Sequence, residues 1–111
     1  MEIICICGST RFIDEMSFLA WEYEKQGSIV FTPRLLPAGR PGLHGSYAPE
    51  SHAAEAANVK ELIDAAYFKK IEMSDKVFVY NRGGYIGEST RNEIGHATKL
   101  GKPISYLEPT R

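Results

Sequence analysis

The sequence predicts a small α/β protein built on a doubly wound, four-stranded parallel sheet of the flavodoxin-like or Rossmann-like kind. Four short apolar runs alternate along the chain with three longer segments in which apolar residues recur at helical spacing. Such alternation implies crossover connections, and these make the strands parallel within one sheet. The 111 residues are enough for one modest core, so we expect a single domain spanning residues 1–111.

The first predicted strand, residues 2–7, is apolar after Glu2, which is typical of a strand covered on both faces. Cys5 and Cys7 are two residues apart, so their side chains point to the same face and are poorly placed for a disulfide. The chain has no other cysteine to complete a zinc site. We interpret both cysteines as small core residues and expect neither a metal nor a cofactor.

The loop after this strand, Gly8-Ser9-Thr10-Arg11, carries a glycine, two hydroxyls and a guanidinium just before a predicted helix. Backbone N–H groups and side-chain donors in that position suit an anion such as a phosphate. The alternative is an ordinary turn in which Ser9 or Thr10 caps the helix.

The first helix is predicted over residues 12–26. Its buried stripe comprises Phe12, Met16, Leu19, Ala20 and Tyr23. Phe18 and Trp21 lie on another face, and exposed aromatic pairs are common anchors of protein interfaces. We therefore expect a homodimer or a larger homo-oligomer. The alternative is that another segment of the same chain covers the two aromatic side chains.

Residues 28–32 are predicted to form the second strand, and residues 33–51 show no regular period. A long irregular segment rich in proline and glycine is usually a lid, a binding loop or a disordered insert. Its candidates for contact with a ligand are Arg34, Arg40, His44 and Tyr47.

The second helix is predicted over residues 53–73, and a third strand follows over residues 76–80. The apolar stripe of this helix comprises Val59, Leu62, Ile63, Ala66 and Tyr67. Asp64 is one of its polar positions, and a solvated surface charge is the alternative to a role in a site.

The stretch of residues 81–93 is the most informative part of the chain. It follows the third strand, contains three glycines and opens a helix that ends at Gly101-Lys102-Pro103, before a fourth strand over residues 103–107. Backbone N–H groups and the positive helix end then converge where an anion can bind. Because the first and third strands end at the same edge of the sheet, both loops should face one cleft. The predicted binding residues are Gly8, Ser9, Arg11, Gly84, Gly87, Glu88, Ser89 and Thr90.

Glu93 is the unusual residue in this helix. At about 100° per residue, it lies on the side of Ala97 and Leu100, which with Ile94 form the predicted buried stripe. A carboxylate that points toward the core near a helix start is a candidate for catalysis. The alternative is a capping box, in which Glu93 reaches back to the N–H of Thr90.

Three segments resemble the nucleoside 2-deoxyribosyltransferase superfamily, which includes the nucleoside 5'-monophosphate N-glycosidases. They are Cys7-Gly8-Ser9-Thr10-Arg11, Asp75 at the start of the third strand, and Asn92-Glu93-Ile94-Gly95-His96-Ala97. The likeness covers about the first 12 residues and roughly residues 62–107. Two features depart from the family pattern: Cys5 stands where members often have a tyrosine, and the turn before the glutamate is longer and richer in glycine.

The resemblance implies an enzyme that cleaves or transfers at an N-glycosidic bond. It implies that Glu93 is the nucleophile, that Ser9 and Arg11 hold the sugar or the 5'-phosphate, and that Asp64 lies near the base. Cleavage develops positive charge on the sugar, which a carboxylate stabilises or attacks. Asp64 or Tyr67 is expected to assist the leaving base, and the helix start is expected to favour the ionised form of Glu93.

Other classes of function remain open or are disfavoured. A non-catalytic module that binds a nucleotide-derived ligand is one alternative, and a nucleotide phosphoribohydrolase is another. A dinucleotide-dependent redox enzyme is disfavoured because the first loop lacks Gly-x-Gly-x-x-Gly. The net charge of −1 gives no reason to expect a nucleic acid polymer or an anionic membrane as partner, and no apolar run approaches about 18 residues, so we expect a cytoplasmic protein.

Overall fold

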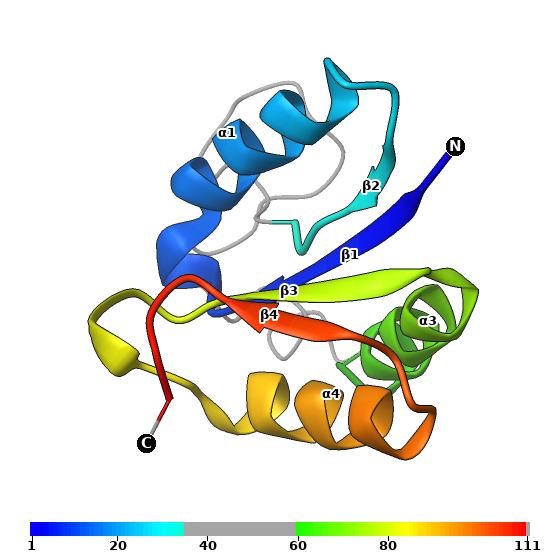
Figure 1. Cartoon of the computed structure of the whole chain (residues 1–111). Helices are drawn as coiled ribbons and strands as arrows, with labels where there is room; N and C mark the ends of the chain where they lie inside the picture. Colours follow the sequence, from blue (N-terminus) through cyan, green and yellow to red (C-terminus); the bar gives the residue numbers. More distant parts are fainter. Residues whose placement is uncertain (35–59, 111) are drawn as a thin grey trace, which may run out of the picture.

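The computed structural model describes residues 1–34 and 60–110, which form an α/β fold (Figure 1). The strands are β1 (Ile3–Gly8), β2 (Ile29–Phe31), β3 (Lys76–Tyr80) and β4 (Ile104–Tyr106). They make one sheet in the order β2-β1-β3-β4, and all three strand pairs are parallel. The α-helices in this part of the chain are α1 (Ile13–Glu24), α3 (Lys60–Met73) and α4 (Glu88–Lys99). The predicted fold class is confirmed.

The helices cover both faces of the sheet. Figure 1 shows α1 on one side and α3 and α4 together on the other. β1 lies between β2 and β3. The chain therefore crosses the sheet in one direction from β1 to β2 and in the opposite direction from β2 to β3. Gly8 at the end of β1 is paired in register with Tyr80 at the end of β3. The loops that follow the two strands therefore start side by side, at the switch point where such sheets bind ligands.

Successive residues of β1 point to opposite faces, and each face has its own hydrophobic cluster. Ile6 packs with Met16 and Ala20 of α1. Cys5 and Cys7 pack on the other face in a cluster with residues of α3, α4 and β3: Tyr67, Ile71, Val77, Val79 and Ala97. Both cysteines are fully buried and free, which confirms that they are core residues.

The prediction for the first helix is confirmed apart from its first turn. Met16 and Ala20 are buried, and Phe12 and Leu19 pack against them. Phe18 and Trp21 are 66% and 57% exposed. The first turn is a short 3-10 helix, η1 (Thr10–Phe12), and the Ser9 hydroxyl accepts a hydrogen bond of 3.2 Å from the Arg11 N–H. Ser9 is thus a cap, as the alternative interpretation of this loop predicted.

The predicted stripe of the second helix is wrong in part over its described residues, although Tyr67 is buried as predicted. Leu62 and Ile63 are exposed, and the buried residues of α3 are Tyr67 and Ile71, one turn apart. The helix turns this narrower face to the sheet, because α4 packs alongside it and Phe68 stacks on His96 at 4.6 Å. Residues 53–59 of the predicted helix, and with them Val59, lie outside the described residues, as do Arg40, His44 and Tyr47.

The capping box, the alternative interpretation of Glu93, is wrong. α4 starts at Glu88 with Gly87 as its N-cap, so Thr90 is the third residue of the helix and not its N-cap. Ala97 is buried as predicted, whereas Leu100 is 44% exposed. Among the described helices, none has both the length and the apolar character needed to cross a membrane.

Candidate active site

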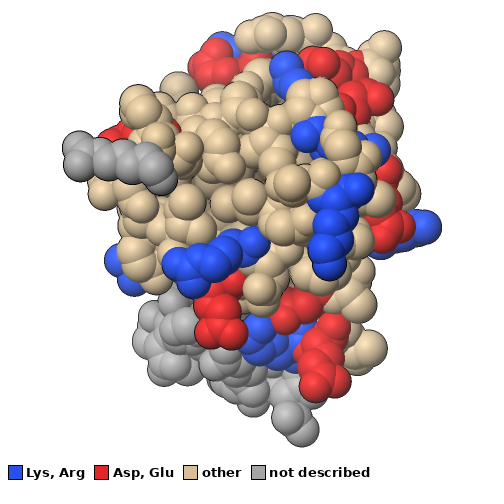
Figure 2. Space-filling view, turned by 60° about the horizontal axis from the view of Figure 1, so that its bottom comes forward, with Lys and Arg blue, Asp and Glu red and all other residues tan. Residues whose placement is uncertain are grey.

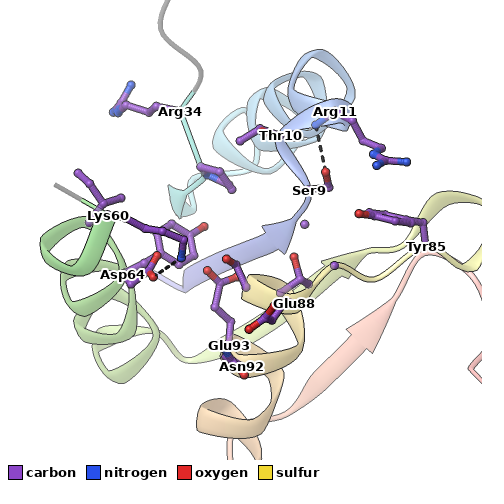
Figure 3. Close-up of a pocket in the computed structure, with 17 residues that line it drawn as sticks. Ser9, Thr10, Arg11, Arg34, Lys60, Asp64, Tyr85, Glu88, Asn92 and Glu93 are labelled. Atoms are coloured by element: carbon purple, nitrogen blue, oxygen red, sulfur yellow. Dashed lines mark hydrogen bonds and ion pairs between the residues drawn. The ribbon is translucent and has the colours of Figure 1, made fainter. Parts of the chain in front are cut away.

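A pocket of about 430 Å³ opens at the carboxyl ends of β1 and β3 (Figure 3). Loops after both strands, the start of α4 and one face of α3 contribute to its walls. Ten residues proposed from the sequence line it: Gly8, Ser9, Arg11, Asp64, Tyr67, Gly87, Glu88, Ser89, Thr90 and Glu93. Arg34, a candidate from the irregular segment, lines it as well. Segments far apart in the sequence therefore meet at one cavity.

Gly84 is not among the described residues that line the pocket. It lies in the short 3-10 helix η2 (Arg82–Gly84) after β3, and its φ of 79° belongs to the left-handed region that favours glycine. The N–H of the preceding residue, Gly83, donates a 2.6 Å hydrogen bond to the Glu108 carboxylate. These glycines shape the turn and hold it to the end of the chain.

Asn81, a buried residue, also connects this turn to Glu108. Its side chain is 1% exposed, donates to the backbone carbonyl of Glu108 at 3.0 Å and accepts from the Glu108 N–H at 2.9 Å. The turn between β3 and α4 is thus held by the segment that follows β4. Because this turn carries Tyr85 and Gly87 to the pocket, the clamp fixes one wall of the site.

Gly8 is required by close packing at the end of β1. A Cβ at this position would lie 2.8 Å from the Met16 sulfur and 3.1 Å from the Tyr80 carbonyl oxygen. A side chain at this position would force the Met16 side chain and the Tyr80 backbone to shift, so glycine fits where β1 pairs with β3 and opens into the pocket. Asp75, part of the family resemblance, also has a structural role, since its carboxylate accepts a 2.7 Å hydrogen bond from the Ile3 N–H.

Glu93 extends from α4 toward the interior of the pocket (Figure 3). The pKa of its carboxyl is raised to about 7, chiefly by burial. A hydrogen bond with Cys7 and the charge of Lys60 lower this pKa, and the charge of Asp64 raises it. The expectation that the helix start would favour the ionised form is therefore wrong. Glu93 is the sixth residue of α4, and the effect of the helix dipole fades beyond the first turn.

Tyr67 is buried in the core and lines the pocket near Glu93. Its hydroxyl donates a hydrogen bond to the backbone carbonyl of Ile6, and burial, with the nearby Cys5, Cys7 and Glu93, raises its pKa well above the usual value. A hydrogen bond with Cys5, burial and the charge of Glu93 likewise raise the pKa of Cys7. The Cys7 thiol thus keeps its proton beside Cys5 and Glu93.

Asp64 faces the same pocket from α3. Lys60, one turn earlier, forms an ion pair with it in which Nζ lies 2.7 Å from the carboxylate. Both side chains are more than 40% exposed, so the pair is worth little to stability, and it leaves a carboxylate and an ammonium at the pocket wall.

The positive side chains lie at two sides of the pocket. Figure 3 shows Arg11 beside Tyr85 on one side and Arg34 and Lys60 on the other, where Asp64 lies next to Lys60, with Glu93 between the two sides. On the face shown in Figure 2, basic and acidic side chains of the described residues are interspersed. Within residues 1–34 and 60–110, no group of His, Cys, Asp and Glu side chains is arranged to hold a metal ion.

Tyr85 and Lys60 are pocket residues that were not singled out from the sequence. An aromatic residue within a glycine-rich turn was a usable signal for Tyr85. Lys60 carried a weaker one, because its position one turn before Asp64 on a predicted helix is also that of an ordinary surface ion pair.

No protein-family model matches the chain, and searches of curated proteins and of solved structures find no significant match to it. The assignment of a function therefore rests on the chemistry of this pocket.

Proposed function

We propose that this protein cleaves or transfers at the N-glycosidic bond of a (deoxy)nucleoside or nucleoside 5'-monophosphate, with Glu93 as the nucleophile. One observation carries the proposal: a carboxyl group with a pKa of about 7 extends into a pocket of about 430 Å³. A carboxyl poised near neutral pH in a cleft is a frequent property of catalytic groups and is costly for a structural one.

The reaction follows from the position of this group. A Glu93 oxygen bonds to the anomeric carbon as the carbon–nitrogen bond breaks, and the electron pair leaves with the base. The base departs more readily when it accepts a hydrogen bond or a proton. Attack by water on the glycosyl intermediate gives hydrolysis, and attack by a second base gives transfer.

We assign the wall formed by Asp64 and Lys60 to the leaving base, since it lies opposite Arg11 (Figure 3). The Asp64 carboxylate accepts hydrogen bonds from the base and holds the Lys60 ammonium, which can donate one to it. Tyr67, the other candidate, already donates its proton to the carbonyl of Ile6 and is therefore a poor donor to the base. Arg11, Ser89 and the N–H groups at the start of α4 provide the donors for a 5'-phosphate.

The test is a panel of ribonucleosides, deoxyribonucleosides and their 5'-monophosphates, with release of free base followed by chromatography. Glu93→Gln should lower base release about 1,000-fold or more, because it removes the nucleophile and retains the shape. Glu22→Gln is the matched control, since Glu22 is a surface residue of α1 that pairs with Lys25. Normal turnover by Glu93→Gln would exclude the nucleophile.

The competing function is a non-catalytic module that binds a nucleotide-derived ligand in the same pocket. It predicts measurable binding of nucleotides from the panel with no release of base from any of them by the wild-type protein. The same panel therefore separates the two functions, provided that binding and base release are measured on one preparation.

The proposal includes a homodimer, or a larger assembly, formed through α1. Phe18 and Trp21 are exposed on this helix, away from the sheet that its other face covers. Large aromatic side chains in pairs commonly anchor interfaces between subunits.

A further inference from the structure

The Arg11 side chain lies flat against an aromatic ring at the pocket. Its guanidinium carbon is 3.7 Å from the centre of the Tyr85 ring, and both residues line the cavity. Figure 3 shows the pair on the side of the pocket opposite Arg34 and Lys60. Arg11 belongs to the loop after β1 and Tyr85 to the turn after β3, so the stack joins the two loops across the switch point.

The Tyr85 ring packs against one aromatic neighbour and borders Gly87. Phe12 meets it edge-on, with ring centres 6.3 Å apart and an interplanar angle of 72°. At the other end, the Tyr85 hydroxyl reaches Gly87, where a Cβ would lie only 3.3 Å from it. The glycine at the start of α4 thus leaves room for the ring, although Tyr85 itself is 39% exposed.

A fixed ring restricts an exposed arginine. A free arginine side chain loses about 2 kcal/mol of rotamer freedom when a ligand orders it, and this loss weakens binding. Stacking on an aromatic face stabilises one arrangement by about 0.5–1 kcal/mol at exposed sites. The guanidinium keeps its in-plane N–H donors available while its face rests on the ring.

We infer that Tyr85 is a positioning residue that holds the Arg11 guanidinium at the pocket for the anionic group of the ligand. Tyr85 thereby sets the preference for a phosphorylated ligand over its uncharged counterpart. The choice of a nucleoside 5'-monophosphate as that ligand rests on the proposed function. The stack itself, and the coupling between the two residues, do not depend on it.

The test compares the dissociation constants of deoxynucleosides and of their 5'-monophosphates by titration calorimetry. The preference for the monophosphate should fall about three- to fivefold in Tyr85→Leu, because the ring face is lost. Tyr85→Phe keeps the ring and should keep the preference. Arg11→Lys should resemble Tyr85→Leu, since an ammonium cannot stack as a plane.

A double-variant cycle gives the decisive result. On an Arg11→Ala background, Tyr85→Leu should cause no further loss of preference, because the group that Tyr85 positions is absent. Equal weakening of nucleoside and monophosphate by Tyr85→Leu, or additive losses in the cycle, would overturn the inference.

The outcome is separable from that of the proposed function. If no base is released from any substrate but the preference changes as expected, the enzymatic proposal fails and the positioning role stands. If base is released while Tyr85→Leu leaves the preference unchanged, the enzymatic proposal stands and the positioning role fails.

Discussion

The two faces of β1 are built from different chemistry. On one face, Ile6 packs against Met16 and Ala20 of α1, and the cluster is entirely apolar. On the other face, Cys5 and Cys7 pack beside Tyr67, and the carboxyl of Glu93 reaches the same region. One strand thus separates a cluster that contributes only packing from one that contains groups able to donate and accept protons.

The difference has an energetic meaning. Apolar side chains gain free energy from burial on either face, whereas a buried carboxyl loses hydration when it ionises. The α1 side should therefore stabilise the fold at every pH. The side of β1 covered by α3 and α4 should stabilise the fold less as Glu93 loses its proton. A carboxyl group that lowers stability in this way is typical of functional sites.

The largest effect is expected on the apolar face. Ile6→Ala should lower the free energy of unfolding by about 2–5 kcal/mol, because it leaves a cavity beneath α1. Cys7→Ala, the neighbouring change on the other face, removes a single sulfur atom and should cost roughly 1 kcal/mol. Urea unfolding of both variants measures the difference, and equal losses would contradict the contrast between the two faces.

Glu93 should make stability and activity change in opposite directions with pH. Its pKa of about 7 in the folded protein exceeds the ordinary value of 4.5, so the folded state binds more protons between these values. Stability should therefore fall by roughly 3 kcal/mol as pH rises from 4.5 through 7, and Glu93→Gln should remove this component. Base release should rise about tenfold per pH unit up to about 7, because only the ionised carboxylate attacks.

Unfolding curves and rates recorded across this pH range measure both trends on one protein. Cys7→Ala is the companion variant, since the wild-type Cys7 thiol lowers the pKa of Glu93. The midpoint of its activity profile should move to higher pH. A midpoint that stays in place would mean that the thiol does not contact the carboxylate.

Tyr67→Phe should have a smaller effect, and on stability rather than on catalysis. It removes the hydrogen bond to the carbonyl of Ile6 and should cost about 0.5–1.5 kcal/mol. Base release should change little, because the hydroxyl is engaged with the backbone. A large loss in the rate of base release without a loss of stability would instead indicate that Tyr67 is the proton donor to the base.

The smallest effect on folding is expected at Trp21, which is 57% exposed. Trp21→Glu should alter the free energy of unfolding of a subunit by less than about 0.5 kcal/mol. It should nevertheless reduce the mass measured by light scattering at micromolar concentration, since it places a charge in the proposed interface. A monomer mass for the wild-type protein, unchanged in the variant, would rule out assembly through α1.

The sheet and the position of the pocket were predictable because each depends on local patterns. Short apolar runs mark strands, and the loops after β1 and β3 meet wherever those strands are adjacent and parallel. The face of α3 that meets the sheet was not predictable in this way. Leu62 and Ile63 have the right spacing for burial but are exposed, whereas Tyr67 of the same predicted stripe is buried together with Ile71, on a helix that packs against α4.

Two features of the site depend on contacts between distant segments. The pairing of Arg11 with Tyr85 exists only after the sheet brings the two loops together. The helix pattern placed Glu93 on the side of the core, but the burial that raises its pKa is produced by the elements that pack around it. The sequence identified the carboxylate, and the packing around it determines how it titrates.

The hydrogen bonds between Asn81 and Glu108 make one wall of the pocket depend on a residue that does not line it. A chain trimmed before Glu108 would lose its hydrogen bonds to Asn81 and to the Gly83 N–H. The buried Asn81 amide would then lack these partners, and the turn that carries Tyr85 would lose its fixed anchor. Truncation before Glu108 would thus loosen one wall of the site while leaving every described lining residue in place.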